Sequence, residues 1–274
     1  MNRSMYPAVL IAVAGSAFAC SRETAEPPVP IAAASTPFPA ISAPSPSASH
    51  APAPPSACPG DMVLVEGMYC PQVEQTCRHY LGAGRFRTYS CARFRPTKCL
   101  SKQRKKLRFC IDRFEYTPPG ESLPRNHVSF DDARAICEQQ GKRICVESEW
   151  NFACEGESIL PYPYGLERDP TACNTDRIDL TGTDGRALID HRTPSGSLPR
   201  CVSPFGLYDM AGNLEELVAR DDFYRGRPAM KGSWWLPSRH NCRARQKTHG
   251  PKYTGIEVGF RCCAEAPQAP ASDL

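Results

Sequence analysis

Two carboxylates near the middle of the chain have the type and spacing of cation ligands. Asp209 and Glu216 lie seven residues apart in residues 203–218, which read S-P-F-G-L-Y-D-M-A-G-N-L-E-E-L-V. Gly212 lies between them and is followed by Asn213. Carboxylates, an amide oxygen and backbone carbonyls exposed at a glycine bend are the ligands that a hard cation such as Ca²⁺ prefers. These residues could form a calcium site, but taken alone they favour a polar turn with exposed acids, because no EF-hand pattern is present.

The elements that position this turn can be partly predicted from spacing. Ser129 and Asp132 form an S-x-x-D capping box, Ile136 and Cys137 continue a helical repeat, and Gly141 follows, so a helix is expected between Ser129 and Gly141. A shorter amphipathic helix is expected over residues 147–154. Strands are expected over residues 61–70, 109–116, 230–235 and 258–263.

Residues 156–199 are rich in glycine and proline, so little regular structure is expected there. This segment nevertheless holds several oxygen ligands, namely Asn174, Asp176, Asp179 and Asp184.

The first 57 residues have the composition of a targeting segment and a linker. Residues 1–19 contain Arg3 and an apolar run ending A-F-A, which predicts a signal peptide. Cys20 follows at the position of a lipoprotein cysteine, so we expect it to carry a lipid anchor; ordinary cleavage at A-F-A is the alternative. Residues 21–57 contain ten prolines and few charges, so 20–57 is expected to be the anchor and a disordered linker.

The remaining residues predict one domain rich in disulfides. Residues 58–265 are long enough for a single domain, with 266–274 as a tail. Fourteen of the fifteen cysteines lie in this domain, which indicates an oxidising compartment. Zinc is the competing interpretation, but the chain has no C-x-x-C pair and no His-x₃-His pair.

A basic segment interrupts the domain over residues 71–108. Between Arg78 and Arg108 the chain has eleven Lys or Arg and no Asp or Glu, with aromatic residues interleaved. Such a pattern is compatible with nucleic acid or an anionic polymer. We favour a disulfide-linked insertion facing an anionic cell surface and expect no nucleic-acid partner, because an exported protein rarely meets nucleic acid.

Seven ordered blocks of sequence then carry a resemblance. They read V-S-F-D-D-A-R-A-I-C, G-K-R-I-C-V-E-S-E-W, Y-P-Y-G, C-N-T-D, F-G-L-Y-D-M-A-G-N-L-E-E, K-G-S-W-W and G-F-R-C-C. In type and order they resemble the sulfatase-modifying-factor family, which includes the formylglycine-generating enzymes. The resemblance covers roughly residues 61–264, apart from the basic insertion. It implies an irregular α+β fold of C-type-lectin-like topology, with bound calcium and disulfides.

The resemblance also implies ligand sets and disulfide pairs. One calcium site would use the side chains of Asp209 and Glu216 with the carbonyls of Gly212 and Leu214. A second calcium site, with a shorter Asn-to-Asp spacing than is usual in the family, is implied by the positions Asn174, Thr175, Asp184 and Arg186. The implied disulfides are Cys137 with Cys262 and Cys154 with Cys242; for Cys263, the partner that we infer is Cys145.

The copper ligands of the family enzymes are absent at the matching positions. Those enzymes hold copper(I) with two cysteines separated by four residues, just after a G-S-aromatic strand, and thiolates are what copper(I) selects. Here Leu236 and Asn241 occupy these positions, and Ser233 alone is retained. Copper is therefore not expected.

The sequence leaves two functional hypotheses. The first is a non-catalytic, calcium-stabilised binding or structural lipoprotein, exported and anchored at the periplasmic side, the outer membrane or the cell surface, with an anionic envelope polymer or a protein as partner. The alternative is a formylglycine-generating oxidoreductase, or a related oxidase, with a rearranged metal site.

Overall fold

The computed structural model describes residues 58–81, 91–183, 185, 187–222, 227–238 and 240–268. The chain divides into two units, and all of these residues belong to the second, Pro52–Leu274. The predicted signal peptide, Cys20 and the linker lie outside the described residues, as do Asp184 and Arg186. None of the helices in the described part is long and apolar enough to cross a membrane.

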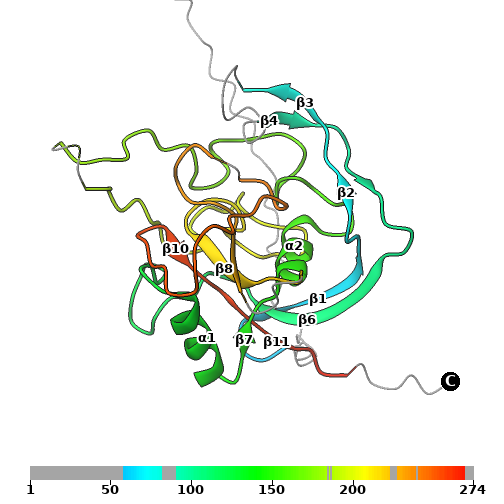
Figure 1. Cartoon of the computed structure of the whole chain (residues 1–274), viewed down its shortest axis with the longest axis horizontal. Helices are drawn as coiled ribbons and strands as arrows, with labels where there is room; N and C mark the ends of the chain where they lie inside the picture. Colours follow the sequence, from blue (N-terminus) through cyan, green and yellow to red (C-terminus); the bar gives the residue numbers. More distant parts are fainter. Residues whose placement is uncertain are drawn as a thin grey trace, which may run out of the picture. The chain divides into compact units, whose positions relative to one another are not determined.

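The largest sheet joins the two ends of the domain. It has four strands in the order β1 (Met62–Tyr69), β6 (Lys105–Asp112), β11 (Cys262–Glu265) and β7 (Arg143–Ile144). Figure 1 shows β1 and β6 running side by side, and they pair antiparallel from Met62 opposite Asp112 to Tyr69 opposite Lys105. The strand predicted over residues 61–70 is confirmed. The strand predicted over 109–116 is shifted, because β6 begins at Lys105 and ends at Asp112.

The two helices lie where the spacing predicts them. Helix α1 (Phe130–Gln139) has a complete capping box, in which Ser129 accepts a hydrogen bond from the backbone of Asp132 and the Asp132 carboxylate accepts one in return. Helix α2 (Glu147–Glu155) is almost completely buried, including Trp150. Both helices present buried side chains to the strands beside them, so packing rather than intrinsic propensity accounts for most of their stability.

A second sheet contains the end of the turn that carries Asp209. Its order is β10 (Val258–Gly259), β8 (Glu215–Ala219) and β9 (Pro228–Lys231), and β8 is buried along its whole length. The strand predicted over 230–235 is wrong in its extent: β9 ends at Lys231, because Ser233 adopts a left-handed φ of 60°. The strand predicted over 258–263 divides into β10 and β11.

The basic insertion forms an arm built from two short strand pairs. Strand β2 (Val73–Glu74) pairs with β5 (Lys98–Cys99), and β3 (Cys77–Tyr80) pairs with β4 (Cys91–Phe94). Two disulfides, Cys70–Cys99 and Cys77–Cys91, link the two sides of the arm. Figure 1 shows β3 and β4 beyond β2, farther along the arm. We call residues 71–108 the basic arm.

Two apolar clusters form most of the core. The first surrounds Trp150, Phe152 and Met210, between the large sheet and α2. The second lies under α1 and contains Phe130 and Phe260. With few and short regular elements, the domain has the irregular α+β architecture that the resemblance implies.

Seven disulfides tie these elements together. The structure pairs Cys137 with Cys262 and Cys154 with Cys242, which are the pairs implied by the family resemblance. It also pairs Cys145 with Cys263, so the adjacent cysteines of β11 bond to opposite sides of the strand. The remaining pairs are Cys58–Cys110, Cys70–Cys99, Cys77–Cys91 and Cys173–Cys201.

Candidate functional site

The turn before β8 buries its carboxylates. Asp209 is 1% exposed and Glu216 is fully buried, so the alternative of a polar turn with exposed acids is wrong. The backbone adopts left-handed conformations at Asp209 (φ 58°), Gly212 (φ 77°) and Asn213 (φ 56°). These three positions turn the chain inward immediately before β8.

The carboxylate of Glu216 is held by two residues. Arg261 donates to both of its oxygens at 2.7 Å, and the indole Nε1 of Trp150 donates to Oε2 at 2.8 Å. Arg261 is itself fully buried and also donates to the carbonyl of Tyr208. A bidentate pair of this kind satisfies two buried charges at once.

A third buried acid, Glu115, joins this group. Its Oε2 accepts hydrogen bonds from Asn213 Nδ2 (2.5 Å) and the Ser195 hydroxyl (2.9 Å), and its Oε1 accepts one from the Leu214 backbone (3.0 Å). Burial raises the pKa of Glu115 well above its ordinary value, and the charges of Asp209 and Glu216 raise it further. We call Glu115, Asp209 and Glu216 the acid cluster.

Asp209 has the least compensated carboxylate of the cluster. Its Oδ2 accepts one hydrogen bond, from the backbone of Gly196 at 2.6 Å. Burial raises the pKa of Asp209 to about 6, against the opposing effects of that hydrogen bond and of Arg261. The acid cluster thus contains more negative charge than its one buried guanidinium balances.

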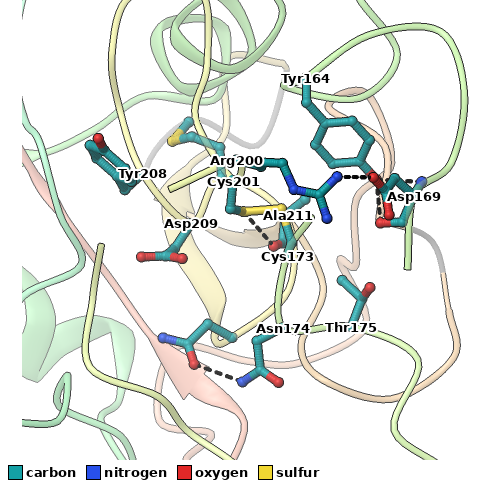
Figure 2. Close-up of a disulfide and its surroundings, with 12 residues drawn as sticks. Tyr164, Asp169, Cys173, Asn174, Thr175, Arg200, Cys201, Tyr208, Asp209 and Ala211 are labelled. Carbon is teal, nitrogen blue, oxygen red and sulfur yellow. Dashed lines mark hydrogen bonds and ion pairs between the residues drawn. A yellow bond between two sulfur atoms is a disulfide. The ribbon is translucent and has the colours of Figure 1, made fainter. Parts of the chain in front are cut away.

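The loop that carries Asn174 packs directly against the turn (Figure 2). The Asn174 carbonyl accepts a hydrogen bond from the backbone of Asn213 at 3.0 Å, and Asn174 Nδ2 donates to Asn213 Oδ1 at 3.0 Å. A Cβ at Gly212 would lie 2.2 Å from the Asn174 carbonyl oxygen, so only glycine fits there. The disulfide Cys173–Cys201 joins the same two loops. Thr175 follows Asn174 and is also buried.

The donor set at the turn suits calcium in kind, because every implied ligand is an oxygen. Within the described residues, no group of three or more His, Cys, Asp or Glu side chains could share a metal ion. A calcium ion at the turn would therefore depend on the carbonyls of Gly212 and Leu214, and would share Glu216 with Arg261. Of the second implied calcium site, the structure describes Asn174 and Thr175, while Asp184 and Arg186 lie outside the described residues.

The resemblance implies that the copper ligands of the family enzymes would lie at Leu236 and Asn241, and His240 directly precedes Asn241. His240 is buried, with its Nδ1 2.8 Å from Arg168 Nη2 and its Nε2 3.0 Å from the Trp234 carbonyl. Arg168 also binds Asp176. Burial and the charge of Arg168 lower the pKa of His240 to about 4, so its ring is neutral and both nitrogens are engaged.

The sequence reasoning missed Glu115, Arg261 and Lys231. Glu115 and Arg261 each lie inside a predicted strand, so a charged residue within a strand segment was the available signal. Lys231 is fully buried at the end of β9, with Nζ 3.7 Å from Glu147 Oε1 and no hydrogen-bond acceptor in the described residues.

Comparisons with known proteins identify a family and relatives for this chain. Residues 100–266 match the model of the sulfatase-modifying factor enzyme 1-like domain. The chain is 32% identical over 161 residues to the inactive Cα-formylglycine-generating enzyme 2 of Bos taurus, covering 54% of this chain and 52% of the relative. It is 35% identical over 187 residues to the formylglycine-generating enzyme of Thermomonospora curvata, covering 54% of this chain and 59% of that one. The chain thus spans about half the length of the curated relatives it matches.

Two solved structures share the fold at low sequence identity. PvdO from Pseudomonas aeruginosa superposes with a TM-score of 0.50 at 18% identity, covering 77% of this chain and 97% of PvdO. CarF superposes with a TM-score of 0.50 at 17% identity, covering 76% of this chain and 99% of CarF.

Proposed function

Because the chain belongs to the family of sulfatase-modifying factor enzyme 1-like domains, we propose that it is a non-catalytic binding member of that family. The observation that carries the proposal is the state of its cysteines. All fourteen cysteines of residues 58–265 are in disulfides, and Leu236 and Asn241 stand where the family enzymes have their copper thiolates. Thiolates are the ligands with which the family enzymes hold copper(I), and residues 58–265 offer no free one.

The nearby Cys242 cannot substitute for these thiolates without loss of a bridge. It is completely buried and bonded to Cys154, at the end of α2. Reducing that bridge would free one thiol next to Asn241 but would release the loop from the core. The similarity to an inactive family member is consistent with this proposal, although the chain is also similar to active ones.

The basic arm is the surface through which we propose that the domain binds an anionic polymer of the cell envelope. Some of its cations already pair with acids, such as Arg93 with Glu167 and Lys106 with Glu66. Other basic side chains are exposed and have no ion pair in the described part of the chain: Arg78, Arg95, Lys102 and Lys105. Rows of unpaired cations attract anionic chains through a salt-dependent field.

Calcium and a lipid anchor complete the proposal. Ca²⁺ at Asp209, Glu216, Gly212 and Leu214 would balance the excess negative charge of the acid cluster and brace a loop-rich domain. An anchor at Cys20 with the proline-rich linker would hold the domain at a membrane surface. Both remain proposals that rest on the sequence and on the family.

The test of the proposal is an assay for the family reaction. The full chain is incubated with a C-x-P-x-R peptide, copper and reductant, and the peptide mass is measured. We expect no change of mass. A product with the thiol-to-aldehyde mass change would contradict the proposal and favour the alternative, an oxidoreductase with a rearranged metal site.

The binding part is tested with dextran sulfate as the anionic probe. Replacing Arg95, Lys102 and Lys105 together by Ala should weaken binding about tenfold or more at physiological salt and reduce its salt dependence. Arg134→Ala is the control, because Arg134 is exposed on α1 outside the arm. Equal binding by the triple variant would exclude the arm as the binding surface.

A further inference from the structure

A cavity of about 560 Å³ lies beside the acid cluster, on the side of α1. Charged, aromatic and hydroxyl side chains line it, among them Asp112, Phe114, Glu115, Tyr116, Lys142 and Ser195. Its volume is in the range of pockets that bind small molecules. Neither the copper-site region nor the basic arm contributes a residue to it.

The charged groups of this cavity favour a cation. Three carboxylates line it, from Asp61, Asp112 and Glu115, against one ammonium, from Lys142. Lys142 is already paired with Asp112 at 2.6 Å. Glu115 receives hydrogen bonds only from neutral groups, one of which is the Ser195 hydroxyl that also lines the cavity.

The buried charges behind Glu115 also favour a cation in the cavity. Asp209 and Glu216 lie near Glu115, and the buried guanidinium of Arg261 is engaged with Glu216. A positive charge entering the cavity would offset this excess of buried carboxylates.

The remaining lining suits a compact molecule with hydroxyl groups. Phe114 stacks on Tyr208 (ring centroids 5.4 Å apart) and Tyr116 stacks on Phe260 (4.9 Å), so both rings are held in place. Hydroxyl and amide groups from Ser122, Ser195, Thr117 and Gln139 provide hydrogen-bond donors and acceptors.

We propose that this cavity binds a small hydroxylated organic cation, with its ammonium group toward Asp112 and Glu115 and its carbon skeleton against Phe114 and Tyr116. This site is separate from the basic arm and has the opposite charge preference. A ligand in this cavity would contact Glu115. Because Asn213 and Leu214 of the turn donate hydrogen bonds to Glu115, binding stabilises the turn.

The test uses glucosamine as the probe and the full chain as the protein. Glucose and N-acetylglucosamine are the matched neutral sugars, and binding is measured by saturation-transfer NMR and calorimetry. We expect glucosamine to bind at least about tenfold more tightly than either neutral sugar, the effect of one charge-assisted hydrogen bond.

Two variants place the binding in the cavity. Gln139 is exposed and lines the cavity, so Gln139→Trp should fill it and abolish glucosamine binding; Ala135→Trp, on the same helix but outside the lining, should retain it. Asp61→Asn, at an exposed position of the lining, should weaken glucosamine but leave glucose unchanged.

Three results would overturn the proposal. They are equal binding of neutral and cationic sugars, glucosamine binding that survives Gln139→Trp, and no glucosamine binding up to about 10 mM, a concentration that detects even a millimolar complex. None of them bears on formylglycine formation or on the arm, so the proposed function can fail independently.

Discussion

Arg261 and Glu216 form a bidentate ion pair, and each side chain is at most 1% exposed. The pair links the residue just before β11, near the C-terminus of the domain, to β8, which follows the signature turn. Trp150 of α2 donates to the same carboxylate, so three elements meet at one group.

Removing one partner of this pair should be costly. Arg261→Met leaves the Glu216 carboxylate buried without its counter-charge, so we expect the free energy of unfolding to fall by about 3–5 kcal/mol. The double variant with Glu216→Gln should recover part of this loss, because no uncompensated charge remains. Denaturant unfolding measures both, with Arg134→Met as the exposed control. A loss below about 1 kcal/mol, as for a surface pair, would contradict the assignment.

Gly212 should tolerate no side chain. Its φ of 77° costs an L-residue about 1–2 kcal/mol, and a Cβ would lie 2.2 Å from the Asn174 carbonyl oxygen. Gly120 is a matched control, because its φ is 84° but a Cβ there would meet nothing within 4 Å. We expect Gly212→Ala to lower the free energy of unfolding by at least about twice as much as Gly120→Ala, measured by denaturant titration. Equal losses would mean that the turn is not packed against Asn174.

Calcium should stabilise the domain through Asp209. Ligand binding to the folded state adds about 2.7 kcal/mol at a hundred times Kd, so a chelator should lower the melting temperature of the wild type. Asp209→Asn keeps an acceptor for the Gly196 backbone and should lose most of the chelator response. Glu216→Ala is a poorer probe, because it also releases Arg261. A melting curve that does not change with chelator would exclude a stabilising calcium ion.

Lys231 should make stability rise with pH above neutrality. Burial lowers its pKa from 10.5 to about 7 in the folded state, so between these values the unfolded chain binds the extra proton. For this group alone, the free energy of unfolding then rises by about 1.4 kcal/mol per pH unit from pH 7 to near 10. Lys231→Met should remove that increment, whereas Lys252→Met, at an exposed position, should keep it. Parallel stability–pH curves for the wild type and Lys231→Met would show that Lys231 stays charged.

Cys20 should determine how the protein partitions between fractions. If it carries a lipid anchor, Cys20→Ala should move the protein from the membrane fraction to the soluble fraction, while Ser21→Ala should not. Immunoblots of fractionated cells measure the distribution. Identical partitioning of wild type and Cys20→Ala would exclude the anchor.

Local signals in the sequence predicted the helices better than the strands. The capping box at Ser129 and Asp132 places the start of α1 because its hydrogen bonds lie within one turn. The end of β9 at Lys231 depends instead on the left-handed Ser233 and on the register of its pairing with β8, which spacing does not give.

The sequence likewise predicted only part of the candidate site. The sequence identified Asp209 and Glu216 as a pair, because they share one short segment. It could not reveal Glu115 and Arg261 as their neighbours, since Glu115 lies after β6 and Arg261 just before β11, both far from the turn in the chain. The burial of Asp209 and Glu216, which rules out a turn with exposed acids, also depends on tertiary packing and cannot be read from a local pattern.

The disulfides determine how the domain would carry tension between its ends. A pull applied at Cys58 crosses directly to Cys110, follows the chain to Cys137, and crosses to Cys262. Residues 59–109 and 138–261 lie outside this covalent path, so their chain cannot be extended by the pull. Only the stretch of about 27 residues between Cys110 and Cys137 could lengthen, by at most about 90 Å. The basic arm would therefore keep its shape while the molecule is stretched, whereas the signature turn would lose its hydrogen bonds to Glu115, which lies in the lengthening stretch.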